Sequence, residues 1–265
     1  MNIFKLFLVF PTIFLLSFLE GSDPPKNIVS MSTAGMEDQG SWSLEFHLQK
    51  NGGLLSSLMI GMTSNFNIGI SYGIQSLIGN QRPKLSKHVP EVHIKYRLIE
   101  ETSTFPAFVL GLNTQGYGDY IDTTDVYEEN LLNSSQNNRY DFKAHGFYIV
   151  LSKNWYLFGN FGLHLGTSYN SWEGSKKDKI PNLIMGIDKD INKNFIFIAD
   201  YNFGLNDKNN PTYGYSAKWP GFLNAGIRWS VSDNLKLDLC VNQIKSYQKF
   251  REMNREIKIL YRQYF

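Results

Sequence analysis

E-I-K-I-L-Y-R-Q-Y-F, residues 256–265, alternates between apolar and polar side chains. Every second side chain is apolar or aromatic apart from one glutamine: Ile257, Ile259, Tyr261, Gln263 and Phe265. The intervening set, which includes Glu256, Lys258 and Arg262, is mostly polar. A period of two is typical of a β-strand with one apolar and one polar face. We expect this strand to pair with the first strand and close a β-barrel, so that its polar row faces Glu45 and His47.

Residues 51–81 carry no charge and could be mistaken for a membrane-spanning helix. The stretch contains six glycines, at positions 52, 53, 61, 69, 73 and 79. An interior glycine destabilises a helix by about 1 kcal/mol relative to alanine. The pattern instead predicts two strands, 54–63 and 66–75, joined by a tight turn at Ser64 and Asn65.

The same alternation recurs along the rest of the chain. It predicts further strands at 41–49, 91–99, 105–114, 140–151, 155–169, 182–188, 195–205, 221–231 and 235–243. With the hairpin and the last strand the total is twelve, and bacterial outer-membrane barrels have an even number of strands. The predicted fold is therefore all-β, a transmembrane antiparallel up-and-down barrel of about twelve strands.

The predicted connections alternate between short and long. The short turns are 64–65, 100–104, 153–154, 190–194 and 232–234. The longer polar connections are 79–90, 115–139, 170–181, 206–220 and 246–255, and the brief link 50–53 is the one departure. Membrane barrels have short periplasmic turns and longer extracellular loops, so this alternation favours a barrel over a soluble sandwich.

The two faces of the predicted strands differ in chemistry. Apolar rows such as Leu235, Leu237 and Leu239 suit contact with lipid, since no helical layer is apparent that could cover them. By strand parity, equal numbers of acidic and basic side chains face inward, which argues against a strongly ion-selective pore. Either these charges pair across strands and plug the lumen, or they line a narrow wet channel. The candidate lumen-lining residues are Glu45, His47, His93, Lys95, Arg97, Asp200, Arg228, Lys236, Asp238, Glu256, Lys258 and Arg262.

The N-terminal region is expected to direct secretion. Lys5 precedes an apolar run over residues 6–19, which predicts a signal peptide at 1–21; an uncleaved helical anchor is the alternative. Residues 22–40 contain two prolines and two glycines without a clear period, and we interpret them as a periplasmic lead-in. The barrel itself is assigned to residues 41–265.

The composition gives little indication of a catalytic or metal-binding site. The formal net charge is +2, without the basic surface that a nucleic-acid-binding protein needs. Cys240 is the only cysteine, and the five histidines show no zinc-binding spacing. His164 and Ser168 lie about 13 Å apart along one strand, too far for a base and its nucleophile. We predict no catalytic residue, metal or cofactor, and no enzymatic activity.

The order of several motifs resembles YjbH-like outer-membrane proteins. The similar segments are I-E-E-T-S-T-F-P-A-F-V-L-G-L-N-T-Q-G-Y-G (99–118), G-F-Y-I-V-L-S-K-N (146–154) and S-T-A-G-M-E-D-Q-G-S-W-S-L (32–44). The resemblance implies the outer membrane of a Gram-negative-type bacterium, outer-membrane lipid as a partner and a link to exopolysaccharide production or export. The likeness to outer-membrane proteins in general also implies that Tyr261 and Phe265 form a signal for the barrel-assembly machinery.

Three functions are compatible with this sequence. The leading hypothesis is a channel or envelope component of the outer membrane, with polysaccharide as a partner. The second is a structural or adhesive barrel with a plugged lumen, whose extracellular loops bind partners. The third, which the sequence favours least, is a barrel lipid hydrolase.

Overall fold

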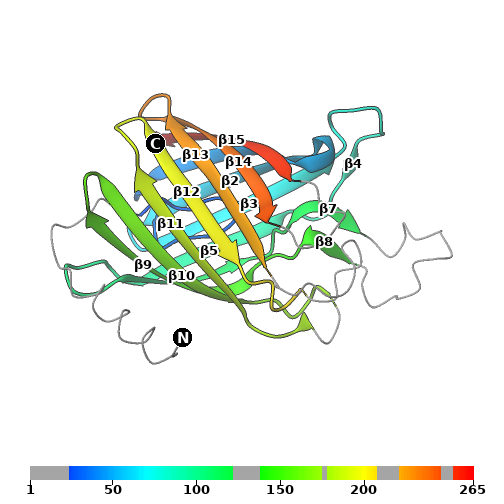
Figure 1. The fold of residues 1–265 in the computed structure, drawn as a ribbon. Coiled ribbons are helices and arrows are strands. Elements are labelled where there is room, and N and C mark those ends of the chain that lie inside the picture. Colours follow the sequence, from blue (N-terminus) through cyan, green and yellow to red (C-terminus); the bar gives the residue numbers. More distant parts are fainter. Residues whose placement is uncertain (1–23, 122–137, 175–177, 208–220, 246–252) are drawn as a thin grey trace.

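The computed structural model describes residues 24–121, 138–174, 178–207, 221–245 and 253–265, which form a closed antiparallel barrel of twelve strands (Figure 1). In ring order the strands are β1 (Ser41–Leu48), β2 (Leu54–Thr63), β3 (Phe66–Gln75), β5 (Glu91–Ile99), β6 (Ala107–Asn113), β9 (Gly146–Tyr156), β10 (Asn160–Tyr169), β11 (Asn182–Asp190), β12 (Phe195–Asn202), β13 (Phe222–Ser230), β14 (Leu235–Lys245) and β15 (Asn254–Tyr264). The predicted all-β barrel and its strand count are confirmed. The expected signal peptide lies outside the described residues.

Three small elements accompany the barrel. The two-residue strand β4 (Lys84–Leu85) extends the sheet beside β3, and η1 (Lys50–Gly52) is a single 3-10 turn between β1 and β2. β7 (Tyr117–Ile121) and β8 (Arg139–Phe142) form a separate two-stranded sheet. None of the described residues forms a helix long and apolar enough to cross a membrane.

The last strand closes the barrel by pairing antiparallel with the first. Leu44 lies opposite Tyr261, and His47 lies opposite Lys258. The Phe265 amide adds a hydrogen bond of 2.9 Å to the carbonyl oxygen of Gly40. The predicted closure, with the polar row of the last strand facing the polar row of the first, is therefore confirmed.

The connections sort by length between the two ends of the barrel. We call the end with the connections 64–65, 100–106, 157–159, 191–194 and 231–234 the turn end, and the opposite end the loop end. The longer connections meet at the loop end, as does the brief link after β1. This arrangement follows the alternation that the sequence predicted.

The turn predicted at Lys153 and Asn154 is wrong. β9 continues through both residues to Tyr156, which pairs with Asn160 across the actual turn. Phe158 and Gly159 have positive φ angles of 51° and 103°. These angles provide the tight reversal, whereas Lys153 and Asn154 remain in extended ladder positions.

The strand predicted at 140–151 is also wrong in its first half. Residues 140–142 belong to β8, outside the barrel wall, and β9 begins only at Gly146. Gly146 has a φ of +71°, so the chain bends there before it enters the wall. The predicted connection 115–139 contains β7, which pairs with β8 across residues that are not described.

The two faces of the wall have opposite chemistry. On β14 the outward Leu239 is 58% exposed, whereas the adjacent Asp238 is fully buried within the barrel. Aromatic pairs lie near both rims: Trp42 with Tyr261 at the turn end, and Phe147 with Trp172 at the loop end. The outward face is thus apolar and is bordered by aromatic rings.

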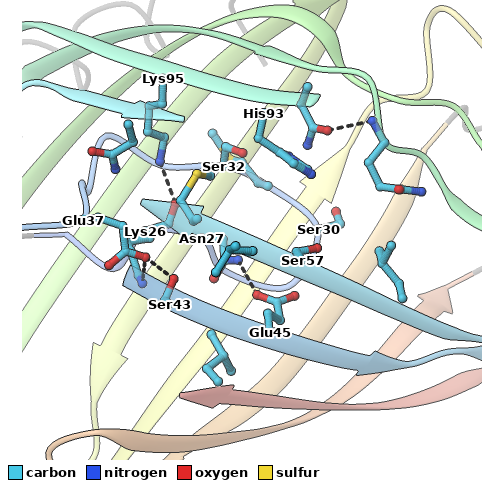
Figure 2. Close-up of a pocket in the computed structure, with 18 of the residues that line it drawn as sticks. Lys26, Asn27, Ser30, Ser32, Glu37, Ser43, Glu45, Ser57, His93 and Lys95 are labelled. Carbon is cyan, nitrogen blue, oxygen red and sulfur yellow. Dashed lines mark hydrogen bonds and ion pairs between the residues drawn. The ribbon is translucent and has the colours of Figure 1, made fainter. Parts of the chain in front are cut away.

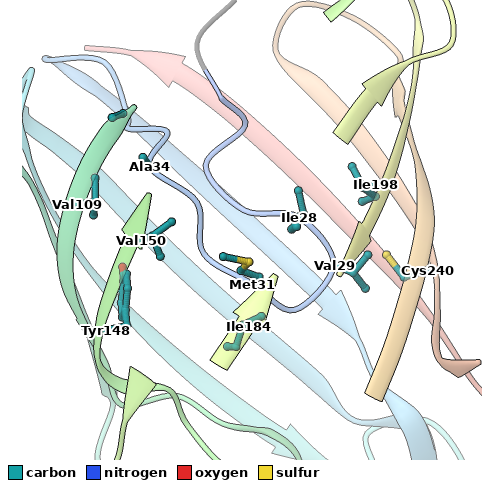
Figure 3. Close-up of a cluster of buried hydrophobic side chains, with 11 residues drawn as sticks. Ile28, Val29, Met31, Ala34, Val109, Tyr148, Val150, Ile184, Ile198 and Cys240 are labelled. Atoms are coloured by element: carbon teal, nitrogen blue, oxygen red, sulfur yellow. The ribbon is translucent and has the colours of Figure 1, made fainter. Parts of the chain in front are cut away.

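The buried apolar cluster of this barrel lies inside the lumen (Figure 3). Ile28 and Met31, which precede the first strand, pack among the inward-facing Val150, Ile184 and Ile198. All five side chains are less than 5% exposed. The segment interpreted from sequence as a lead-in therefore packs within the barrel, and one side of the lumen wall is apolar.

Candidate functional site: the plugged lumen

Residues 24–40, here called the plug hairpin, enter the barrel from the turn end and fold back on themselves. Asn27 and Ser32 form a β-bridge, and the Ile28 amide donates to the Met31 carbonyl at 3.0 Å. The hydroxyl of Thr33 donates to the carbonyl of Pro25. Few of the hydrogen-bonding groups of so short a hairpin are satisfied within it, so the remainder require partners from the barrel.

Two lysines of the wall bind carbonyl oxygens of the plug hairpin. Lys95 on β5 donates to the carbonyls of Lys26 and Gly35 at 2.9 and 2.8 Å. Lys258 on β15 donates to the carbonyl of Val29 at 2.6 Å. Both side chains are almost completely buried. Hydrogen bonds from charged donors are about twice as strong as neutral ones, so these contacts anchor both limbs of the hairpin.

An acidic side chain binds the tip of the hairpin. Asp200 on β12 accepts hydrogen bonds from the amides of Ser30 and Met31, at 2.6 and 3.2 Å, and from the Ser30 hydroxyl at 2.8 Å. Asn224 on the neighbouring strand donates to Asp200 at 2.7 Å. The Asp200 carboxylate thus accepts the hydrogen bonds that two successive amides would otherwise make to backbone carbonyl groups.

Arg228 on β13 links the wall to the hairpin. Its guanidinium makes two hydrogen bonds of 2.7 Å to Asp238 on β14, and it donates to the carbonyl and the side-chain oxygen of Asn27 at 3.1 and 3.2 Å. Asn27 in turn donates to Glu45 at 3.1 Å. The cross-strand pair of Arg228 with Asp238 neutralises both buried charges. The N–H groups of Arg228 that donate to Asn27 position the hairpin.

Two wall glycines make room for apolar side chains of the hairpin. A Cβ atom at Gly186 would lie 2.2 Å from Cδ1 of Ile28, and one at Gly166 would lie 3.0 Å from Cε of Met31. Both distances are shorter than ordinary van der Waals contact between carbon atoms. These glycines on β11 and β10 therefore form seats that receive Ile28 and Met31.

The base of the plug hairpin is joined to the barrel by ionic contacts. Glu37 pairs with Lys26 and accepts from the Ser43 hydroxyl, and Arg262 of β15 pairs with Asp38. The Nε atom of Arg262 lies 3.8 Å from Oε2 of Glu37. Burial lowers the pKa of Lys26, and the neighbouring Glu37 carboxylate opposes that shift.

Cavities remain along the lumen beside the hairpin. The cavity at the turn end, lined by Pro24, Asp233 and Lys236, measures about 240 Å³. The next, of about 100 Å³, contains His93, Lys95, Glu45 and Glu37 in its wall (Figure 2). Cavities of about 40 and 20 Å³ follow toward the loop end. Among these four cavities, the volume decreases from the turn end to the loop end.

The loop end is closed by residues that fold inward from the connections. Tyr117 on β7 borders both the cavity of about 100 Å³ and that of about 40 Å³, and its ring lies 5.7 Å from that of His47. The Tyr140 hydroxyl donates to Glu91 at 3.2 Å. Arg139 on β8 forms an ion pair of 2.7 Å with Asp207. Lys258 lies where the two closures meet, since its Nζ is also 5.9 Å from the Tyr117 ring centre.

Most of the predicted lumen-lining side chains are buried or half-buried within the barrel. Besides those already placed, His47 contacts Glu256 at 2.6 Å, and Lys258 lies 3.9 Å from Glu45. His93 contacts the Ser71 hydroxyl at 2.7 Å. Arg97 lies near the turn end, where it donates to the Asn65 side chain at 3.3 Å and reaches Glu100 at 3.4 Å.

The structure also joins three residues that the sequence did not connect. His164 contacts the Ser152 hydroxyl at 2.8 Å through Nδ1 and Asp188 at 2.7 Å through Nε2. The residues come from β10, β9 and β11, and His164 and Ser152 are register partners. Comparison of His164 only with Ser168 on its own strand does not find Ser152 or Asp188. Cross-strand register would have placed these residues beside His164.

The geometry of this cluster is structural. In serine hydrolases the histidine contacts serine through Nε2 and the acid through Nδ1, the reverse of what is seen here. All three side chains are at most 1% exposed, and Ser152 accepts a hydrogen bond of 2.9 Å from the Ala34 amide of the hairpin. The cluster thus holds the returning limb of the hairpin. Within the described residues, no group of three or more His, Cys, Asp or Glu side chains could hold a metal ion.

Comparisons with known proteins return structural neighbours only. No protein-family model and no curated protein matches the sequence. Among solved structures, the NanC porin is 10% identical, with 84% of this chain and 99% of that chain covered and a TM-score of 0.45. The CymD monoaromatic hydrocarbon channel is 11% identical, with 86% and 89% covered and a TM-score of 0.39. The outer membrane channel DcaP of Acinetobacter baumannii is 9% identical, with 93% and 100% covered and a TM-score of 0.31.

Proposed function

We propose that this protein is an outer-membrane barrel of the channel type whose lumen is held closed by its own plug hairpin. The observation that carries the proposal is the contrast between an apolar outer face and a polar, partly hollow lumen that residues 24–40 occupy. A closed barrel leaves no unpaired strand edge, so its wall can cross a hydrocarbon layer.

The outer membrane is favoured by the distribution of side chains on the wall. Leucine, isoleucine and aromatic side chains face outward along the middle of the strands, whereas outward charges such as Lys189 and Arg255 lie near strand ends. Outer-membrane barrels carry such an apolar band between aromatic girdles. In that orientation the turn end and the base of the plug hairpin face the periplasm.

The channel class is supported by the polar lining and by the cavities in series. Interior charges such as Lys95, Asp200 and Arg228 would be unfavourable in a barrel that needed only an apolar core. Displacement of the hairpin would join the turn-end cavity to the central one, because both are bordered by Lys26 and Asn27. Small polar solutes are the substrate class that this lumen suits.

A role in exopolysaccharide export is the finer form of this proposal, and polysaccharide is the corresponding partner. It rests on the resemblance of residues 32–44, 99–118 and 146–154 to YjbH-like proteins. The measurement that tests it is the secreted polysaccharide of cells that lack the protein. Unchanged secretion would remove the polysaccharide role and leave the channel class standing.

A structural or adhesive barrel is the second candidate. The observation that favours it is the number of buried charged side chains, Lys95, Asp200, Arg228 and Lys258 among them, whose partners lie on the hairpin. A plug held so fully could be permanent. The loops at the loop end would then bind partners outside the cell.

Single-channel recording separates the two candidates. Wild-type protein in a lipid bilayer should show brief openings or none, and a variant lacking residues 24–37 should show longer openings, interrupted only by the closure at the loop end. Removal of residues 80–82 from an exposed loop serves as the matched control and should behave as wild type. Heat-modifiable migration in detergent gels verifies folding of each variant. If the folded deletion variant does not conduct, the channel proposal fails.

The C-terminal side chains Tyr261 and Phe265 are proposed as the signal for the barrel-assembly machinery. Phe265 is 83% exposed and Tyr261 faces outward, so both are accessible to a membrane-embedded partner. Deletion of Phe265 should lower the amount of protein assembled in the membrane without changing the conductance of the molecules that do assemble. Normal assembly of that variant would contradict the assignment.

A further inference from the structure

We infer that the lumen wall is a binding site for a short polypeptide hairpin with two apolar anchors three residues apart, and that the plug hairpin is its intramolecular occupant. A separate polypeptide with the same pattern of side chains can then bind in place of the plug hairpin. The inference rests on the proposed occupancy of the lumen by residues 24–40, and it does not require conduction.

The first argument is that the wall recognises main-chain atoms. Lys95, Arg228 and Lys258 donate to carbonyl oxygens of residues 26, 27, 29 and 35. Asp200 and Ser152 accept from the amides of residues 30, 31 and 34. Such groups are present in any polypeptide, so this set of contacts binds the backbone of a hairpin largely independently of its side chains.

The second argument is that two seats select side chains. Gly186 and Gly166 leave space for Ile28 and Met31, and Ile184, Ile198 and Val150 surround these anchors (Figure 3). A polar or charged side chain in either seat would be buried among aliphatic groups without a hydrogen-bond partner. The seats therefore require apolar side chains at both positions.

The remaining positions of the hairpin differ in how many side-chain contacts they make with the wall. Asn27 and Ser30 make side-chain hydrogen bonds, to Arg228 and Asp200, so short polar residues suit these positions. Lys26 and Ser32 border the central cavity (Figure 2), and Lys26 also pairs with the buried Glu37. The expected ligand therefore has apolar anchors, short polar residues near the tip and a basic residue at the position of Lys26.

The third argument is that the occupant is separable from the wall. The hairpin joins β1 through Asp38 and Gln39, which are exposed at the turn end. Every other contact with the wall is non-covalent. Cleavage at this connection leaves the occupant in its site, held only by the contacts described above.

The experiment uses the full chain with a protease site inserted between Asp38 and Gln39. The protein is folded, cleaved and mixed with an excess of a fluorescent synthetic peptide of residues 24–38, and exchange is followed by anisotropy. The native peptide should replace the fragment, and an M31L peptide, which keeps both anchors apolar, should bind within about tenfold of it. An I28D/M31D peptide should bind at least about a hundredfold more weakly, because two charges would enter apolar seats.

A complementary pair tests the seat directly. Gly186→Val in the wall should weaken the native peptide, and an I28A peptide should recover binding because it frees the volume that valine takes. If this wall variant fails to fold, the three peptides on the wild-type wall still decide the matter. A fragment that never exchanges, or binding equal for the native and I28D/M31D peptides, overturns the inference.

The outcome is distinguishable from failure of the proposed function. Selective peptide exchange by a barrel that never conducts would end the channel proposal and retain the peptide site. Longer openings on loss of residues 24–37, without selective peptide binding, would do the reverse.

Discussion

The two ends of this barrel are closed in different ways. At the turn end, the plug hairpin is held by charged side chains that belong to the wall: Lys95, Asp200, Arg228 and Lys258. At the loop end, much of the closure is made between connections, as in the ion pair of Arg139 with Asp207. The plug hairpin is thus anchored on the strands of the barrel, which form the most cooperative part of the molecule.

The difference suggests an order of opening. Strands of a closed sheet open only with the whole barrel, whereas elements outside the sheet open locally at lower free energy. β7 and β8 lie outside the sheet and contact the wall through side chains, among them the hydrogen bond from Tyr140 to Glu91 and the ring pair of Phe142 with Phe222. We therefore expect the loop end to open first and the plug hairpin to leave last.

The largest effect should come from Arg228→Ala. Loss of the guanidinium leaves Asp238 buried without its partner, and breaking a buried pair in this way destabilises proteins by about 3–5 kcal/mol. The free energy of unfolding in urea, measured in lipid vesicles, should fall by that amount. Arg97→Ala is the control, because its ion pair with the exposed Glu100 contributes less than about 1 kcal/mol. Equal losses for the two variants would contradict the anchoring role of Arg228.

Gly186→Val should have the next largest effect. Valine would occupy the seat of Ile28, and overpacking of this kind destabilises proteins by about 1–3 kcal/mol. Protease sensitivity of residues 24–40 should rise, and a second substitution, Ile28→Ala, should restore protection. Gly53→Ala, where the nearest atom to the new Cβ is 3.5 Å away, is the control. Failure of the second substitution to rescue the first would place the strain elsewhere.

Arg139→Ala should act locally, although its ion pair is as buried as that of Arg228. Residues 139–146 should exchange amide hydrogens faster, while the urea unfolding midpoint moves far less than in Arg228→Ala. The reason is that β8 is not part of the barrel sheet. If both arginine variants lower the unfolding midpoint equally, the two closures do not differ as proposed.

The smallest effect is a pH dependence at the loop end. Burial raises the pKa of Glu173 to about 7, from its ordinary value of 4.5, although its Oε2 accepts from the Ala144 amide at 3.1 Å. The folded protein therefore retains this proton more strongly than the unfolded chain does. Its contribution to stability is present below about pH 4.5 and is lost as the pH rises to about 7.

Hydrogen exchange at Ala144, corrected for the intrinsic pH dependence, measures this effect. Protection in the wild type should decline between about pH 4.5 and pH 7, and in Glu173→Gln it should stay level. Glu100→Gln, which alters an exposed glutamate at the turn end, is the control. A decline that persists in Glu173→Gln would assign the titration to another group.

The sequence predicts the wall well where alternation is regular. Strands 54–63, 66–75 and 91–99 end at the predicted residues, since tight turns and charged rows mark them. The turn after β9 was misplaced because Ser152 and Asn154 are residue types that favour turns, whereas two of the three residues of the actual turn, 157–159, are apolar. Only positive φ angles at Phe158 and Gly159, which the sequence does not announce, locate the turn.

The contents of the lumen were harder to predict. Residues 24–40 show no regular alternation of apolar and polar side chains because they do not belong to the barrel sheet. Their conformation depends on wall side chains as distant in sequence as Asp200 and Lys258. Strand parity does place the charged side chains inside. It does not reveal that Lys95 binds carbonyl groups of the hairpin rather than an acidic side chain.

The central claim is that residues 24–40 occupy the lumen, and amide hydrogen exchange of residues 28–34 in lipid vesicles tests it most directly. The amides of Ile28, Ser30, Met31 and Ala34 all donate hydrogen bonds inside the barrel. The account predicts protection close to that of β12 and β15. Exchange at the rate of an unstructured chain, while both strands stay protected, would contradict it.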